Sequence, residues 1–217
     1  MPTPAARATK LDGGRVAAEN RIESAGSVVG VDNPGAPWGP ILVRSAVAAA
    51  YGALTVFWQE PGEGVLIVAG GLFLLLTGAA MAVTAAAAGG RRPLKPLLLV
   101  ESVLYAAAAI AVFLMGTTEA FCFAAAAALI IAGALELALW RRFRTDFLPA
   151  RDWLITGGIS VGTGILLPVF LELGAHAQLG VSGGGAIIIA VILAISGFGA
   201  RHDARSAGSV GGPKAVN

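Results

Sequence analysis

The chain has 217 residues, of which 56% are hydrophobic and 13% are charged, and its mean hydropathy is +0.78. Because a soluble domain carries about 25% charged residues, this composition excludes an ordinary soluble protein and indicates a membrane protein. The net charge of +2 comes from basic residues spread over separate stretches, which argues against a nucleic-acid partner. Cys122 is the single cysteine, so neither a disulfide nor a Cys-based metal site is predicted. We expect it to be a small core residue.

Residues 1–37 are rich in proline and glycine, with mixed charges and no apolar run long enough for a core. This composition predicts a disordered cytoplasmic tail. The tail does not have the pattern of a cleaved secretory signal, because the first apolar stretch starts only at Ile41 and is long enough to span a bilayer. Residues 201–217 predict a second polar tail, also cytoplasmic. The transmembrane domain is predicted to cover residues 38–200.

Six apolar segments lie between the tails, each close to the roughly 20 residues that a helix needs to cross about 30 Å of hydrocarbon. Their predicted bounds are 41–58, 65–88, 97–115, 120–140, 153–171 and 181–200. Backbone groups in lipid must be satisfied within the segment, and these runs lack the alternating pattern of barrel strands. The sequence therefore predicts an all-α membrane protein with six transmembrane helices.

All 15 lysines and arginines lie on one side of this alternation. The loops on the other side carry only acidic residues and one histidine as titratable groups, namely Glu60, Glu63, Glu119, Glu172 and His176. The positive-inside rule then predicts a bacterial inner-membrane protein with both termini in the cytoplasm. We expect the outer face to change from negative at neutral pH to slightly positive below about pH 4, a reversal that would sense or reduce proton attraction.

Glu172 and His176 form an i, i+4 pair if the fifth helix extends that far. Two such residues are too few for a metal site. The alternative is that both are solvated loop residues.

An internal repeat is visible in the odd-numbered segments. Val56-Phe57, Val112-Phe113 and Val169-Phe170 recur near the outer ends of these segments at spacings of 56 and 57 residues. Each repeat is a helical hairpin, and an even number of spans gives all three hairpins the same orientation. The sequence thus predicts three parallel hairpin repeats related by a pseudo-threefold axis along the membrane normal.

Short motifs recur at corresponding places in the hairpins. They are Leu42-Val43-Arg44-Ser45, Leu99-Val100-Glu101-Ser102 and Ile155-Thr156-Gly157-Gly158, together with Trp58-Gln59-Glu60-Pro61-Gly62, Gly133-Ala134-Leu135-Glu136-Leu137 and Trp140-Arg141-Arg142. Over residues 38–203 these motifs resemble the HdeD-type acid-resistance membrane proteins. The resemblance implies a six-span inner-membrane protein associated with survival of acid stress, without an established chemistry.

Three charged residues lie inside apolar segments: Arg44, Glu101 and Glu136. Each is about 5–6 Å inside the predicted cytoplasmic end of its helix. Because an ionised side chain at mid-bilayer costs about 2.5–3.5 kcal/mol, we expect these residues to face inward and to pair. We predict an ion pair between Arg44 and Glu101, with Glu136 near enough to compete or to be protonated. The pair either locks hairpin to hairpin, while Glu136 reaches toward Arg141 or Arg142, or takes part in a proton relay.

Polar residues also follow one face of two predicted helices. They are Tyr51 and Thr55 with Arg44 on the first helix, and Thr156, Ser160 and Thr163 on the fifth. One interpretation is a hydrated groove between the two helices. The other is close packing, in which hydroxyls bond across helices or to their own backbone and Gly158-x-x-x-Gly162 forms a packing face.

The sequence contains no phosphate-binding loop, catalytic-serine elbow or His-Glu-x-x-His motif, so no enzyme activity, cofactor or metal is predicted. We expect a non-enzymatic membrane protein of acid or envelope stress, with membrane lipids as partners and a membrane-protein partner or a homo-oligomer as further candidates. Two alternatives stay open. One is a small proton-linked transporter or channel that uses Arg44, Glu101 and Glu136, and the other is a scaffold that binds partner proteins or lipids.

Overall fold

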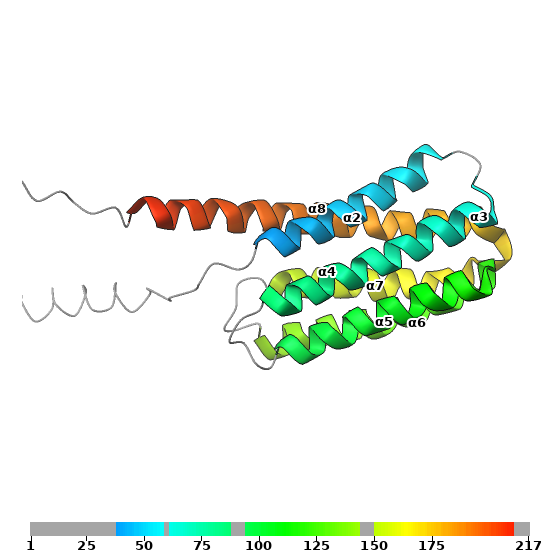
Figure 1. Ribbon diagram of the computed structural model, residues 1–217, viewed down its shortest axis with the longest axis horizontal. Helices are drawn as coiled ribbons and strands as arrows, with labels where there is room; N and C mark the ends of the chain where they lie inside the picture. Colours follow the sequence, from blue (N-terminus) through cyan, green and yellow to red (C-terminus); the bar gives the residue numbers. More distant parts are fainter. Residues whose placement is uncertain (1–37, 59–60, 88–93, 144–149, 211–217) are drawn as a thin grey trace, which may run out of the picture. The chain divides into compact units, whose positions relative to one another are not determined.

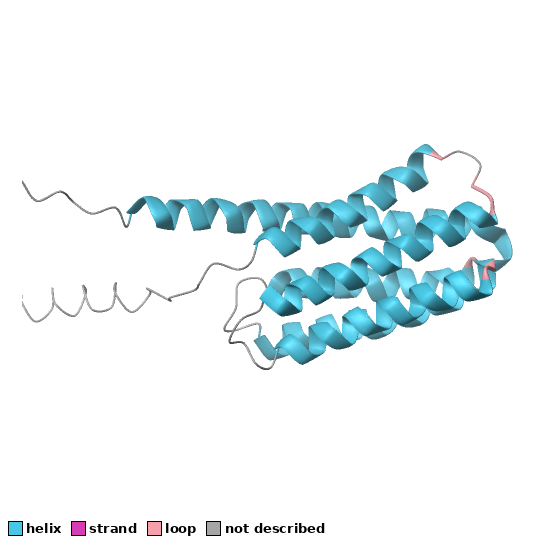
Figure 2. Cartoon of the chain, viewed as in Figure 1, coloured by secondary structure: helices cyan, strands magenta, loops and turns pink. Residues whose placement is uncertain are grey.

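The computed structural model describes residues 38–58, 61–87, 94–143 and 150–210. All regular structure in these ranges is helical, and six helices are long and apolar enough to cross a membrane (Figure 2). The predicted all-α, six-helix membrane architecture is therefore confirmed. The tail predicted for residues 1–37 lies outside the described residues.

The six spans begin and end within a few residues of their predicted bounds, except the last. Five spans are single helices: α2 (Trp38–Phe57), α5 (Leu94–Met115), α6 (Thr118–Phe143), α7 (Ala150–Val169) and α8 (Gly174–Val210). The second span combines α3 (Glu63–Val65), a π-helical turn (Leu66–Gly70) and α4 (Gly71–Ala87). A 3₁₀ turn at Leu171–Leu173 connects α7 to α8.

Helix α8 is longer than predicted at both ends. It begins at Gly174, whose φ of 77° lies in the left-handed region that glycine tolerates. It continues to Val210, so the first part of the predicted polar tail at 201–217 is helical. The Arg201 guanidinium carbon lies 5.4 Å from the centroid of the Trp38 ring. This cation–π contact connects the extension of α8 to the start of α2.

The helices form a closed cyclic order in which each span packs against its sequence neighbours and α8 packs against α2. The most extensive contacts join α2 to α8, α4 to α5 and α6 to α7, whereas contacts within each predicted hairpin are smaller. In this order, α2–α4–α5–α6–α7–α8, helices α2 and α6 stand on opposite sides. A side chain that joins α2 to α6 must therefore cross the centre of the bundle.

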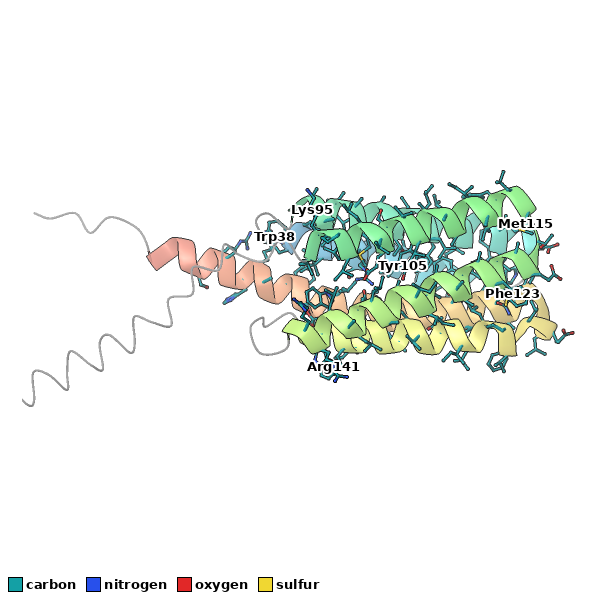
Figure 3. The ribbon with its side chains drawn as sticks, turned by 90° about the horizontal axis from the view of Figure 1, so that it is seen from below. Trp38, Lys95, Tyr105, Met115, Phe123 and Arg141 are labelled. Atoms are coloured by element: carbon teal, nitrogen blue, oxygen red, sulfur yellow. The ribbon has the colours of Figure 1, made fainter. Side chains whose placement is uncertain are left out.

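The charged residues are separated between the two ends of the bundle. The starts of α2, α5 and α7 and the ends of α4 and α6 lie together, and α8 continues past them on the same side (Figure 1). We call this the basic end, because it carries Lys95, Arg141, Arg142, Arg151, Arg201 and Arg205. Figure 3 shows Lys95 and Arg141 there and Met115 at the opposite, acidic end. Glu63, Glu119, Glu172 and His176 belong to the acidic end, and Glu60 lies outside the described residues.

Glycines bring the backbones of α6 and α7 into contact. A Cβ on Gly157 would lie 2.8 Å from the carbonyl oxygen of Gly133, and one on Gly133 would lie 2.7 Å from that of Gly157. The predicted packing pair Gly158 and Gly162 is wrong, because a Cβ on either would meet nothing within 4 Å. The α7 glycines that face α6 are instead Gly157 and Gly164.

The outer surface of the bundle is apolar and its interior is built largely from small residues. Phe57 and Leu114 are 82% and 81% exposed, in positions where lipid would cover them. Cys122 belongs to a buried cluster that is rich in alanine. The expectation that it is a small core residue is confirmed.

Candidate functional site: a buried charge cluster

Charged side chains from three helices meet in the interior of the bundle. Arg44 comes from α2, Glu101 from α5 and Glu136 from α6, and they are 9%, 0% and 2% exposed. Each lies six or seven residues in from the basic end of its helix, which is about 10 Å along the axis. The prediction that these residues face inward is confirmed.

Arg44 and Glu136 form a buried ion pair. The guanidinium donates from Nη2 to Glu136 Oε1 at 2.6 Å. The Thr156 hydroxyl, from α7, lies 2.6 Å from Glu136 Oε2 and 2.9 Å from the carbonyl oxygen of Asp152. A hydroxyl can donate one hydrogen bond, and a charged acceptor gives the stronger bond. We therefore infer that the Thr156 hydroxyl donates to Glu136. Both oxygens of the Glu136 carboxylate are thus satisfied, and the ion pair together with Thr156 joins helices of all three predicted hairpins.

The predicted partner of Arg44 was wrong. The structure pairs Arg44 with Glu136, whereas Glu101 makes no hydrogen bond to it. The physical reason is that α2 faces α6 across the bundle and α7 supplies the second donor to Glu136. The alternative that Glu136 reaches toward Arg141 or Arg142 is also wrong, because both arginines are exposed while Glu136 is buried.

Glu101 is buried without a hydrogen-bond partner on either carboxylate oxygen within the described part of the chain. It lies close enough to Arg44 and Glu136 to interact with both electrostatically. One turn further along α5, the Tyr105 hydroxyl approaches Ser160 of α7, yet Ser160 Oγ has no partner at hydrogen-bonding distance among the described residues. The centre of the bundle therefore contains polar groups whose hydrogen-bonding capacity is not used.

The charges of this cluster do not balance when all its members are ionised. One guanidinium and two carboxylates sum to −1. In the low dielectric of a helix bundle an uncompensated charge is costly, so the cluster needs one further positive charge or one fewer negative charge. Within the described residues no group of three or more His, Cys, Asp or Glu side chains could hold a metal ion.

The polar stripes on α2 and α7 face the interior and make contacts within the bundle. The Tyr51 hydroxyl lies 2.7 Å from Ser182 Oγ of α8, and the Thr55 hydroxyl donates to the carbonyl of Gly52 in its own helix at 2.8 Å. Thr163 packs against α8 at Gly185. Thr156 and Ser160 lie in the charge cluster. Bonds across helices and to a helix's own backbone are the contacts that the close-packing interpretation predicts.

Gln178 on α8 is a buried polar residue that the sequence analysis did not single out. It is fully buried, and its Nε2 donates to the carbonyl of Leu167 at 2.8 Å. Its Oε1 has no partner among the described residues. In the sequence, Gln178 is an amide just before an apolar run. An ordinary loop residue can occupy the same position, so the sequence does not distinguish the two.

The acidic end contains an interaction between two hairpin turns. Glu63 Oε1 accepts from the Thr118 backbone N–H at 2.7 Å and from its hydroxyl at 2.9 Å. A carboxylate at this position caps the N-terminus of α6 and complements its dipole. The alternative of a helical pair between Glu172 and His176 is wrong, because α7 ends before them and the chain changes direction at Gly174. Both side chains are exposed, as the alternative of solvated residues predicts.

No protein-family model, curated protein or solved structure matches this chain. The six apolar helices define a multi-pass integral membrane protein. Its distinguishing feature is the buried cluster of Arg44, Glu101 and Glu136.

Proposed function

We propose that the protein is a non-enzymatic component of the bacterial inner membrane that takes part in acid or envelope stress, with both termini in the cytoplasm. The resemblance of residues 38–203 to HdeD-type proteins motivates the proposal. The observation that carries it is the depth of the Arg44–Glu136 ion pair. The pair is about 10 Å from the basic end and about 20 Å from the acidic end of a 20-residue helix such as α2.

This placement suits a protein that must stay folded while the outside is acidic. Under the proposed topology, the charges that join α2 to α6 lie near the buffered cytoplasmic side. Protons from outside reach Glu136 only across about 20 Å of the helix bundle. The carboxylates at the acidic end take no part in the interaction that joins α2 to α6.

The proposal includes three hairpin repeats around a pseudo-threefold axis. Around the cyclic order of helices, smaller contacts within hairpins alternate with extensive contacts between hairpins. A threefold arrangement of equivalent hairpins produces this alternation. The ion pair and Thr156 then connect one helix from each repeat.

The test is acid survival of cells that lack the protein. We expect reduced survival, restored by the native chain but not by Glu136→Gln, because the amide no longer balances Arg44. The matched control is Glu172→Gln, the same chemical change at an exposed position, which should restore survival fully. Unchanged survival of the deletion strain would exclude the stress role.

A second candidate function is a small proton-linked transporter or channel that uses Arg44, Glu101 and Glu136. The unpartnered carboxyl of Glu101 favours it, because a purely structural cluster has no need of an unsatisfied acid. Purified protein in liposomes with an internal pH dye provides the test. Proton movement that the native chain supports and Glu101→Gln abolishes would establish transport, whereas equal rates with and without protein would exclude it.

A further inference from the structure

We propose that Glu101 is a proton-binding site at the centre of the bundle, where its carboxyl group carries a proton while Glu136 carries the charge that balances Arg44. The inference concerns which carboxyl holds the proton. It stands whether or not the protein moves protons across the membrane, and it is independent of the stress role.

Burial without partners is the first argument. Glu101 is 0% exposed, and neither of its oxygens has a hydrogen-bond partner among the described residues. An ionised carboxylate in such a place would have lost its water and gained no donors. A neutral acid in the same place has lost far less solvation, so the surroundings select the protonated form.

The arrangement of neighbouring charges is the second argument. Arg44 points its guanidinium at Glu136, which also accepts from Thr156, so the cation of the cluster is paired with the other carboxylate. A second negative charge on Glu101 would repel Glu136 and leave the cluster at −1. One proton on Glu101 makes the cluster neutral.

Among the described residues, no other titratable group in the helices packed against α5 supplies this balance. Helix α4 and the π-helical turn contain no titratable residue. Helix α6 contributes Glu136, while its Glu119 and Cys122 lie near its start at the acidic end and its exposed Arg141 and Arg142 lie at the basic end. On α5 itself, Tyr105 is a neutral phenol near Glu101, and Lys95 is exposed at the start of the helix.

The ligand is a proton and not a metal cation. A metal ion needs several oxygen ligands in a shell, and the described part of the chain offers Glu101 no further unpaired carboxylate to complete one. The Arg44 guanidinium lies near enough to interact with Glu101, and it would repel a bound cation. A proton needs no added space and is held by the carboxyl group alone.

Infrared spectroscopy of the full chain in lipid bilayers tests the proposal. At neutral pH we expect a carbonyl band of a protonated carboxyl group, absent in Glu101→Gln and present in the double variant Arg44→Met with Glu136→Met, which removes the paired charges together. Absence of the band from the native protein, or its loss in the double variant with retention in Glu101→Gln, would overturn the assignment.

A second measurement needs no variant and covers the case in which the double variant does not fold. Dicyclohexylcarbodiimide, which reacts with protonated carboxyls in apolar surroundings, is applied to the native protein and the adduct is located by mass spectrometry. We expect the adduct on Glu101 and none on Glu136, with the yield falling as pH rises. An adduct on Glu136 alone, or labelling that sodium suppresses at constant pH, would overturn the proposal.

Discussion

Replacing Glu136 by glutamine should destabilise the bundle strongly, and replacing Glu101 by glutamine should not. The two substitutions are chemically identical, and both sites are almost completely buried. They differ in that Glu136 balances Arg44 at 2.6 Å, whereas Glu101 has no hydrogen-bond partner among the described residues. The comparison therefore isolates the contribution of the ion pair.

The expected magnitudes follow from these contacts. Glu136→Gln leaves the Arg44 guanidinium buried without a counter-charge, which costs about 3–5 kcal/mol. The amide oxygen still accepts from Thr156, so that hydrogen bond is retained. Glu101→Gln exchanges a neutral acid for an amide of the same shape, and we expect a change below about 1 kcal/mol. Arg44→Met with Glu136→Met removes both charges and should restore most of the stability lost in Glu136→Gln.

The assay is unfolding of the purified protein in mixed micelles by increasing dodecyl sulfate, followed by tryptophan fluorescence. It gives the free energy of unfolding of the native protein, the two single variants and the double variant. We expect the order native, Glu101→Gln, double variant, Glu136→Gln, from most to least stable. A loss of several kcal/mol in Glu101→Gln, with Glu136→Gln within about 0.5 kcal/mol of the native protein, would show that Arg44 pairs with Glu101 and would refute the reasoning.

Three further predictions concern packing and capping. In the same micelle assay, Gly157→Leu should lower the free energy of unfolding by about 1–3 kcal/mol, because its Cβ meets a backbone carbonyl. Gly158→Leu is the control, and it should change this free energy by less than about 0.5 kcal/mol because the space around its Cβ is open. Tyr51→Phe should cost about 0.6 kcal/mol by removing the hydroxyl contact to α8, and an unchanged stability would count against that contact. Glu63→Gln should accelerate hydrogen exchange at the Thr118 amide, measured by mass spectrometry, and protection equal to native would contradict the cap.

The architecture was predictable because lipid imposes it. Segments of sufficient length without charges must be helices, and the distribution of lysine and arginine separates the two ends. The ends of α8 were less predictable. Hydropathy reports only the part of a helix that contacts lipid, and residues beyond Arg201 continue the helix as polar turns.

The partner of Arg44 could not be predicted because a sequence does not state the order of helices around a bundle. Arg44 and Glu136 are 92 positions apart, and their contact depends on α2 and α6 facing each other across the centre. Likewise, α7 has glycines on several faces, so spacing alone suggested the pair Gly158 and Gly162. The fold shows that Gly157 faces α6 instead. Inward orientation was predictable from charge, whereas pairing required the tertiary arrangement.

The central claim is that the chain forms a six-span bundle with its basic end in the cytoplasm. Labelling of single cysteines with a membrane-impermeant maleimide tests it most directly. The native Cys122 is buried and is replaced by alanine in the background. In intact cells we expect labelling of Glu172→Cys at the acidic end and no labelling of Arg142→Cys at the basic end until the membrane is permeabilised. Labelling of Arg142→Cys in intact cells, with Glu172→Cys protected, would contradict the account.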